Sequence, residues 1–269
     1  MKFEDSSFGK RLGTMLKVDF RRMFTMPLVY IMVGACLVMP ILILVMTTMM
    51  DGTESVNPQT GEVTIVEGFG STWQIIGSTG TAGSDAAGAM AMDMTSMCNI
   101  NLLYFIVAVL VCIFVADDFR SGYAKNLFTV RAKKSDYVVS KTLVCFVGGA
   151  MMILAFFVGS LLGGAISGLS FAMEGFHVTN LVMCVLAKML LIAVFVALYL
   201  LWSVIAKQKL WLSLVGSFCT GMFLFMMIPM LTPLDATVVN VLGCLIGGVL
   251  FSIGLGAASN AILKKTSLV

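Results

Sequence analysis

Charged residues and histidines are scarce in this sequence. Only 12% of its 269 residues are charged, it contains a single histidine, and 59% of its residues are hydrophobic, with a mean hydropathy of +1.01. This apolar content exceeds what a soluble core of this length could bury. The composition therefore excludes an ordinary soluble domain and indicates a membrane protein.

Long apolar runs with few polar interruptions occur six times along the chain. The hydrocarbon core of a bilayer is about 30 Å thick and takes about 20 residues of helix, which matches the length of these runs. Barrel strands would alternate apolar and polar residues, whereas these runs are apolar on every face. We therefore predict an all-α integral membrane protein of one domain with six transmembrane helices, at 28–49, 100–116, 143–162, 181–204, 210–231 and 238–258.

Lysine and arginine are absent from three of the connections between these runs. Sixteen of the 17 basic residues lie in the two terminal segments and in the two other connections. Short loops rich in lysine and arginine stay in the cytoplasm. We therefore predict that both termini are cytoplasmic and that the acidic connections, including the long loop 51–97, are extracellular.

The amino-terminal segment has a pattern of its own. Apolar residues recur at helical spacing over 7–26, opposite a basic face, and Pro27 follows. This pattern predicts an amphipathic helix that lies in the membrane interface. The alternative is a basic flank that only fixes the orientation of the first span.

The connection 117–141 is too long for a tight turn. Tyr123, Leu127 and Val130 fall on one side of a short helix, and Lys125 and Arg131 can stay in water. This segment could therefore present an apolar ridge to a protein partner on the cytoplasmic side.

In this connection the chain resembles the ABC type-2 permeases. Their second helix usually ends with an acidic residue before a glycine, followed by a short coupling helix, a basic residue and a lysine entering the third helix. The resemblance extends to the interfacial helix, the six spans and the cytoplasmic ends, although many family members carry their larger extracellular element between the fifth and sixth spans. It implies a coupling region that docks on an ATPase subunit and that includes Asp118, Arg120, Gly122, Tyr123, Lys125, Asn126, Leu127 and Arg131.

The sequence contains no G-x-x-x-x-G-K-[ST] phosphate loop and no cluster of acids, histidines or nucleophiles within the spans. We therefore expect no enzymatic activity, no catalytic residue and no directly bound cofactor. The resemblance implies a separate ABC ATPase chain that holds ATP and Mg²⁺, together with a second permease chain in a homo- or heterodimer. Membrane lipids surround the complex, nucleic acid is not a partner, and the location is the plasma membrane, in a bacterium.

The cargo implied by the resemblance is an amphipathic or hydrophobic molecule, such as a peptide, an antimicrobial or a drug. Exporters of lipid-linked glycans or of metal ions belong to the same family, and a channel or secondary carrier without an ATPase is the alternative from another class. A Met-rich run before Cys98 could bind Cu(I), but with 22 methionines in the chain we predict no metal site.

Lys188 is the one ionisable residue well inside a predicted span. Burial of a charge in a bilayer is costly, so Lys188 is a candidate for the transport pathway, or else its long side chain reaches the outer headgroups. Glycine pairs with small-xxx-small spacing, such as Gly159 with Gly163 and Gly243 with Gly247, allow close helix contacts either within the chain or between two copies.

Overall fold

The computed structural model describes residues 8–56, 63–65, 68–78, 99–130, 133–173 and 175–265. The described part is a bundle of helices with one antiparallel pair of short strands, β1 (Glu54–Val56) and β2 (Val63–Ile65). The α-helices are α1 (Phe8–Thr25), α2 (Pro27–Met50), α4 (Leu103–Arg120), α5 (Tyr123–Val130), α6 (Lys134–Ser167), α7 (Val178–Ala206), α8 (Leu210–Phe225), α9 (Ile228–Leu231) and α10 (Val238–Lys265). Two 3₁₀ turns, η1 (Thr72–Ile75) and η4 (Ile100–Leu102), complete it.

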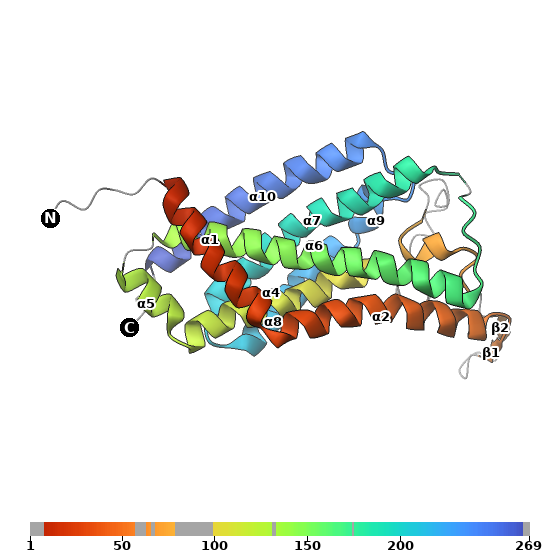
Figure 1. Cartoon of the computed structure of the whole chain (residues 1–269), viewed down its shortest axis with the longest axis horizontal. Helices are drawn as coiled ribbons and strands as arrows, with labels where there is room; N and C mark the ends of the chain where they lie inside the picture. Colours follow the sequence, from red (N-terminus) through yellow and green to blue (C-terminus); the bar gives the residue numbers. More distant parts are fainter. Residues whose placement is uncertain are drawn as a thin grey trace.

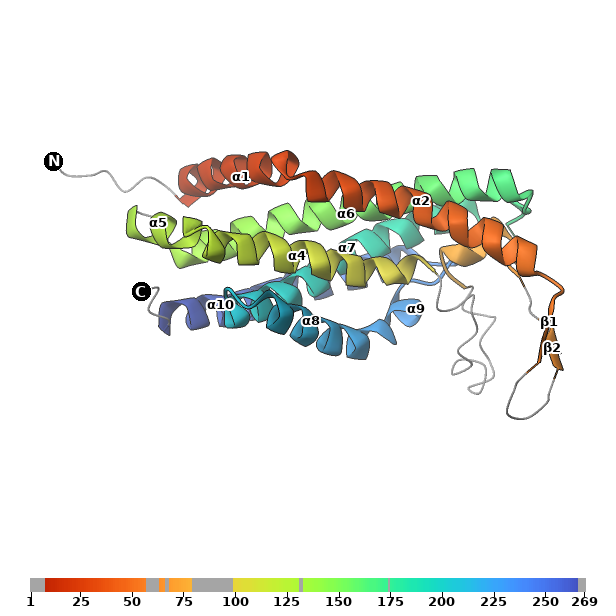
Figure 2. The ribbon, with the colours of Figure 1, turned by 90° about the horizontal axis from the view of Figure 1, so that it is seen from below.

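The long helices run side by side along the longest axis of the molecule (Figures 1 and 2). One end of the bundle holds α1, α5, the connection between α7 and α8, and the last turn of α10. We call it the basic end, because Lys207, Lys209, Lys264 and Lys265 lie there. The opposite end holds the last turn of α2, η1, the connection between α6 and α7, and α9.

Five helices of the described residues are long and apolar enough to cross a membrane: α2, α4 with the preceding η4, α6, α7 and α10. The remaining predicted span, 210–231, is divided. It forms α8, a helix of 16 residues, then a turn at Met226 and Met227, then the short α9 with Pro229 in its first turn. Proline lacks the N–H of a continuing helix and fits its first turn, which explains the break at this position. The count of six membrane crossings stays a prediction.

The connection 117–141 is shorter than we predicted, because helices extend into it from both sides. α4 continues through Asp117 and Asp118 to Arg120, and α6 begins at Lys134 rather than near Leu143. Our boundaries were set where charged residues begin. The helices continue past these bounds because Asp118 and Lys141 are buried inside the protein and satisfied by ion pairs. The limits of the membrane-spanning parts stay a prediction.

The predicted amino-terminal helix is present as α1. It crosses the basic end of the bundle obliquely (Figure 1) and packs mainly on α6. Its buried residues are Met15, Asp19 and Met23, which lie four residues apart on one face, whereas Phe8, Val18 and Phe24 are exposed. α1 therefore binds the bundle through a single narrow stripe, and its position in the membrane interface stays a prediction.

The glycine pair of α6 serves contacts inside the chain. A Cβ atom on Gly159 would collide with the carbonyl oxygen of Leu37, and one on Gly163 would lie 2.9 Å from the Cα atom of Ile41, so both glycines let α2 pack closely on α6. Cβ atoms on Gly243 and Gly247 of α10 would meet nothing within 4 Å among the described residues. The two pairs therefore differ: within the part of the chain that the structure describes, the pair of α6 is used for packing and the pair of α10 is not.

Residues 68–78, from the long predicted loop, cover the opposite end of the bundle. Trp73, Ile75 and Ile76 are buried, and the Trp73 indole donates a hydrogen bond to the carbonyl oxygen of Phe171 (3.0 Å). Backbone hydrogen bonds join Thr72 N to Ser170 O (3.0 Å) and Leu234 N to Ser78 O (2.9 Å). This part of the loop is therefore folded onto the bundle, whereas the Met-rich run before Cys98 lies outside the described residues.

Candidate functional site

Four charged side chains meet at the basic end, where α1, α4 and α6 converge. We call this cluster, made of Asp19, Arg22, Asp118 and Lys141, the four-charge network. Lys141 Nζ lies 2.9 Å from Asp19 Oδ1 and 2.7 Å from Asp118 Oδ2, and the Arg22 guanidinium donates to Asp118 Oδ1. Two carboxylates and two cations thus alternate around one point, and their charges balance.

The centre of the network is fully enclosed. The side chains of Asp19, Asp118 and Lys141 are 0% exposed. Each carboxylate also accepts from a hydroxyl: Tyr137 donates to Asp118 Oδ2 (2.9 Å), the oxygen that also faces Lys141, and Ser140 donates to Asp19 Oδ2 (2.6 Å). Buried charges are tolerated only with such complete pairing, and removal of one partner typically costs about 3–5 kcal/mol. The network therefore fixes the relative positions of three helices.

Arg22 extends the network to α5. Its guanidinium lies 4.0 Å from the centroid of the Tyr123 ring, and Tyr123 is the first residue of α5. Partial burial lowers the pKa of the Arg22 guanidinium, but the charge of Asp118 and the hydrogen bond to it outweigh burial, so the pKa lies above its ordinary value. Arg22 is therefore a permanent cation between α4 and α5.

α5 is a separate two-turn helix with two different faces. Gly122 turns the chain between α4 and α5 with a φ of +72°, a conformation that glycine adopts without strain. Ala124 is buried, and the Phe128 ring packs edge-on against Tyr137 at 5.3 Å, whereas Lys125 and Asn126 are exposed. The helix is thus held by its apolar side and presents a polar side outward.

A second buried polar cluster lies around Lys188 of α7. Its Nζ donates to Asn101 Oδ1 and to Thr232 Oγ1, both at 2.9 Å, and the side chain is 0% exposed. The Tyr104 hydroxyl donates to the backbone oxygen of Lys188 at 2.9 Å. No carboxylate of the described residues forms an ion pair with this lysine. Lys188 therefore points into the bundle toward η4 and α9 and does not reach the surface.

A comparison with protein-family models decides what kind of protein carries these clusters. A model described as an ABC-2 family transporter protein matches residues 16–228, which is most of the chain. The chain belongs to the ABC-2 transporter family. No match was found among curated proteins or among solved structures. Together with its apolar helices, the match makes this ABC-2 protein a multi-pass membrane component of a transporter.

The structure places the predicted coupling residues of this ABC-2 protein that it describes at the basic end, where they make different contacts. Asp118 lies in the four-charge network, Tyr123 contacts Arg22, and Gly122 forms the turn between them. Arg120 lies to one side, where its Nε donates to Gln208 O (3.2 Å) and so ties α4 to the connection before α8. Lys125 and Asn126 are exposed on α5, Leu127 is packed against the core, and Arg131 lies outside the described residues.

Sequence reasoning missed Asp19 and Arg22 as members of the site in this ABC-2 protein. A signal for Asp19 was present. It occupies the position between Met15 and Met23 at i, i+4 and i+8, so an acid stands within the apolar stripe of an amphipathic helix. Such a residue needs a buried cation, and Lys141 supplies it. For Arg22 the pattern of α1 gave no comparable signal, because it lies among other basic residues on a polar flank.

Proposed function

We propose that this ABC-2 protein is the transmembrane subunit of an ATP-driven exporter and that α5 docks on a separate ATPase subunit. The observation that carries the proposal is the four-charge network behind α5. An isolated surface helix could not move the bundle, whereas α5 contacts Arg22, which in turn holds Asp118 of α4 and through it Lys141 of α6.

Coupling follows from the cost of separating these groups. A push on the exposed side of α5 reaches Tyr123 and Phe128, which contact Arg22 of α1 and Tyr137 of α6. Since the buried ion pairs stay closed, α1, α4 and α6 shift together rather than one at a time. ATP and Mg²⁺ are held by the partner, and the permease contributes the moving helices.

This proposal sets the orientation and the assembly. The basic end faces the cytoplasm, where ATP is available, and α8 with α9 forms the sixth crossing. Two permease chains with two ATPase chains form the complex in the plasma membrane of a bacterium. The cargo is an amphipathic or hydrophobic molecule such as a peptide, an antimicrobial or a drug, because the spans are apolar on every face.

Lys188 has a distinct part in this proposal. It is a buried cation held only by neutral oxygen atoms among the described residues, so a carboxylate of a passing substrate would be a stronger partner than Asn101 or Thr232. We therefore assign it to the pathway.

Cross-linking tests the docking site. Asn126→Cys is placed on the exposed side of α5, and Thr237→Cys at the opposite end is the matched control. With native cysteines that react removed, Asn126→Cys should cross-link to the co-expressed ATPase and Thr237→Cys should not. Equal cross-linking of the two variants to the ATPase would contradict the docking site. Transport of cargo without any ATPase would instead support a channel or carrier. An ATPase-stimulation screen over peptides, drugs, lipid-linked glycans and metal ions then identifies the cargo class.

A further inference from the structure

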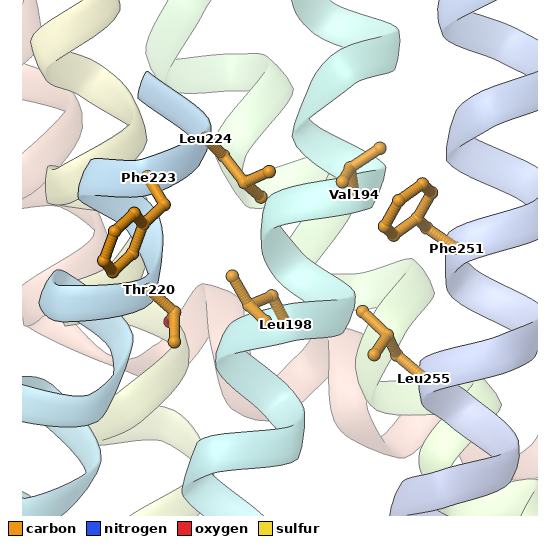
Figure 3. A pocket seen from close by; sticks show the side chains of 7 residues that line it. All are labelled: Val194, Leu198, Thr220, Phe223, Leu224, Phe251 and Leu255. Atoms are coloured by element: carbon orange, nitrogen blue, oxygen red, sulfur yellow. The ribbon is translucent and has the colours of Figure 1, made fainter. Parts of the chain in front are cut away.

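An apolar groove runs along α7 between α8 and α10. Its lining includes Val194 and Leu198 of α7, Thr220 and Phe223 of α8, and Phe251 and Leu255 of α10, and Figure 3 shows α8 and α10 on opposite sides of α7. Its volume is about 240 Å³. Drug-sized ligands usually occupy about 300–1,000 Å³, so this space suits one slender chain better than a bulky molecule. We call it the α8–α10 groove.

The residues that line the groove have no free hydrogen-bonding group for a polar ligand. Thr220 is its one polar residue, and the Thr220 hydroxyl already donates to Gly216 O (2.7 Å) and accepts from the Trp202 indole (3.1 Å). Phe223 is 81% exposed at the edge of the groove, which is therefore open to the side. In a membrane, an open apolar groove on the side of a bundle faces lipid tails.

Four lysines lie at the ends of α8 and α10 that are at the basic end. Lys207 and Lys209 precede α8, and Lys264 and Lys265 end α10. Among the described residues none of these lysines forms an ion pair. After residue 174 the chain contains a single acid, Asp235, which lies in the connection between α9 and α10. Among the described residues, the ends of α8 and α10 at the basic end therefore carry four lysines that no acid pairs with.

The distance between the groove and these lysines is close to the depth that one lipid acyl chain reaches below its headgroup. Leu255 precedes Lys264 by nine residues, or about 14 Å of helix, and Phe223 follows Leu210 by 13 residues, or about 20 Å. Half of a hydrocarbon core is about 15 Å thick. With a headgroup at the lysines, an acyl chain would thus reach the groove. Trp211 is 66% exposed in the first turn of α8, where an aromatic ring marks the level of the headgroups.

We propose that the α8–α10 groove binds one acyl chain of an anionic phospholipid, whose headgroup is held by Lys207, Lys209, Lys264 and Lys265. The lipid comes from the leaflet that surrounds the basic end. It fills the gap over α7 and thereby joins α8 to α10. The site is independent of the transported cargo and of the ATPase.

Native mass spectrometry of the full chain tests this site. The protein is equilibrated with equal amounts of dioleoylphosphatidylglycerol and dioleoylphosphatidylcholine in detergent micelles, and the retained lipids are counted. We expect one tightly held phosphatidylglycerol per chain and a preference over phosphatidylcholine of at least about fivefold, the effect of one engaged lysine. The preference should fall as the ammonium acetate concentration rises.

Substitutions separate the two parts of the site. Replacement of the four lysines by glutamine should bring the preference for phosphatidylglycerol close to one. The control replaces Lys10, Lys17, Lys125 and Lys133 by glutamine. It removes the same charge elsewhere at this end and should leave the preference unchanged. Leu198→Trp, or Leu255→Trp where the first variant does not give a single gel-filtration peak, should lower retention of both lipids at least fivefold. Val249→Trp, on an exposed part of α10, is the control.

Equal binding of the two lipids by the wild type, or unchanged retention in the filled-groove variants, overturns the proposal. Phe223→Cys supplies a further readout. Oxidative cross-linking of two chains at this position in lipid vesicles would show that a second copy occupies the groove, and this result also overturns it.

Discussion

Lys141 Nζ lies 2.7 Å from Asp118 Oδ2, and both side chains are fully buried between α4 and α6. Neither residue could be there alone. A buried charge without a partner costs several kcal/mol, whereas a balanced set of charges with all hydrogen bonds made costs much less. The pair therefore holds α4 against α6, and through Asp19 and Arg22 the same network holds α1.

Lys141→Met should lower the free energy of unfolding by about 3–5 kcal/mol, because Asp19 and Asp118 would then share one cation. The double variant Lys141→Met with Asp19→Asn restores the charge balance, so it should be more stable than the single variant. Denaturant titration in micelles, followed by tryptophan fluorescence, measures both. Asp117→Asn is the control: its carboxylate is 52% exposed and pairs with Arg22 at 3.3 Å, so its loss should cost less than about 1 kcal/mol. A double variant no more stable than the single one would contradict this account.

Arg22→Lys should uncouple ATP hydrolysis from transport in the reconstituted complex. Lysine keeps the charge but cannot contact Asp117, Asp118 and the Tyr123 ring together as the planar guanidinium does. We expect transport per ATP hydrolysed to fall at least about tenfold, equivalent to about 1.4 kcal/mol. Arg21→Lys on the neighbouring exposed position should behave as the wild type. If both variants transport normally, the contact between α1 and α5 has no part in coupling.

Lys188→Met should reduce transport strongly and stability only slightly. Removal of a buried cation is favourable, but it leaves Asn101 Oδ1 without its donor, which costs about 1–3 kcal/mol, so the two effects nearly cancel. Vesicle transport assays and melting temperatures, with Met189→Leu as control, separate the two roles. A variant that transports normally would show that Lys188 serves the structure alone.

Gly159→Ala should destabilise the bundle, whereas Gly243→Ala should not. A Cβ atom at residue 159 would collide with backbone of α2, which cannot move without separating the two helices, so a loss of about 1–3 kcal/mol is expected. A Cβ atom at residue 243 meets no described residue within 4 Å, and alanine in an exposed helix position is favoured over glycine by up to about 1 kcal/mol. Melting temperatures of the two variants in the same detergent test the difference. Equal effects would mean that α2 adapts its position, contrary to the close packing described above.

Much of the fold was readable from the sequence, because a bilayer forces apolar runs to form helices. The amphipathic spacing of Phe8 to Met23 likewise located α1, and the residues around Gly122 located α5. The ends of helices were less accessible. Charges at Asp118 and Lys141 look like the edges of spans in a one-dimensional pattern, and only their pairing in space shows that the helices continue.

The sequence predicted only those residues of the candidate site that lie close together along the chain. Asp118, Gly122 and Tyr123 follow one another in the sequence, so a local pattern could find them. Asp19 and Lys141 are 122 residues apart, and their meeting depends on how α1 crosses α6. The fold of residues 68–78 over the opposite end was also out of reach, because Trp73 and Ile75 make their contacts with segments that lie far along the chain.

Those few contacts of residues 68–78 have a consequence for the direction in which the bundle can open. Three hydrogen bonds, from Thr72, Trp73 and Leu234, fasten this segment across two connections that belong to different helix pairs. Each such bond contributes about 0.5–1.5 kcal/mol. The basic end is held together by buried ion pairs, whereas the opposite end is covered by residues 68–78, whose hydrogen bonds are individually weak. To open at this end, the bundle must break these hydrogen bonds and expose Trp73, Ile75 and Ile76, whereas to open at the basic end it must separate buried charges.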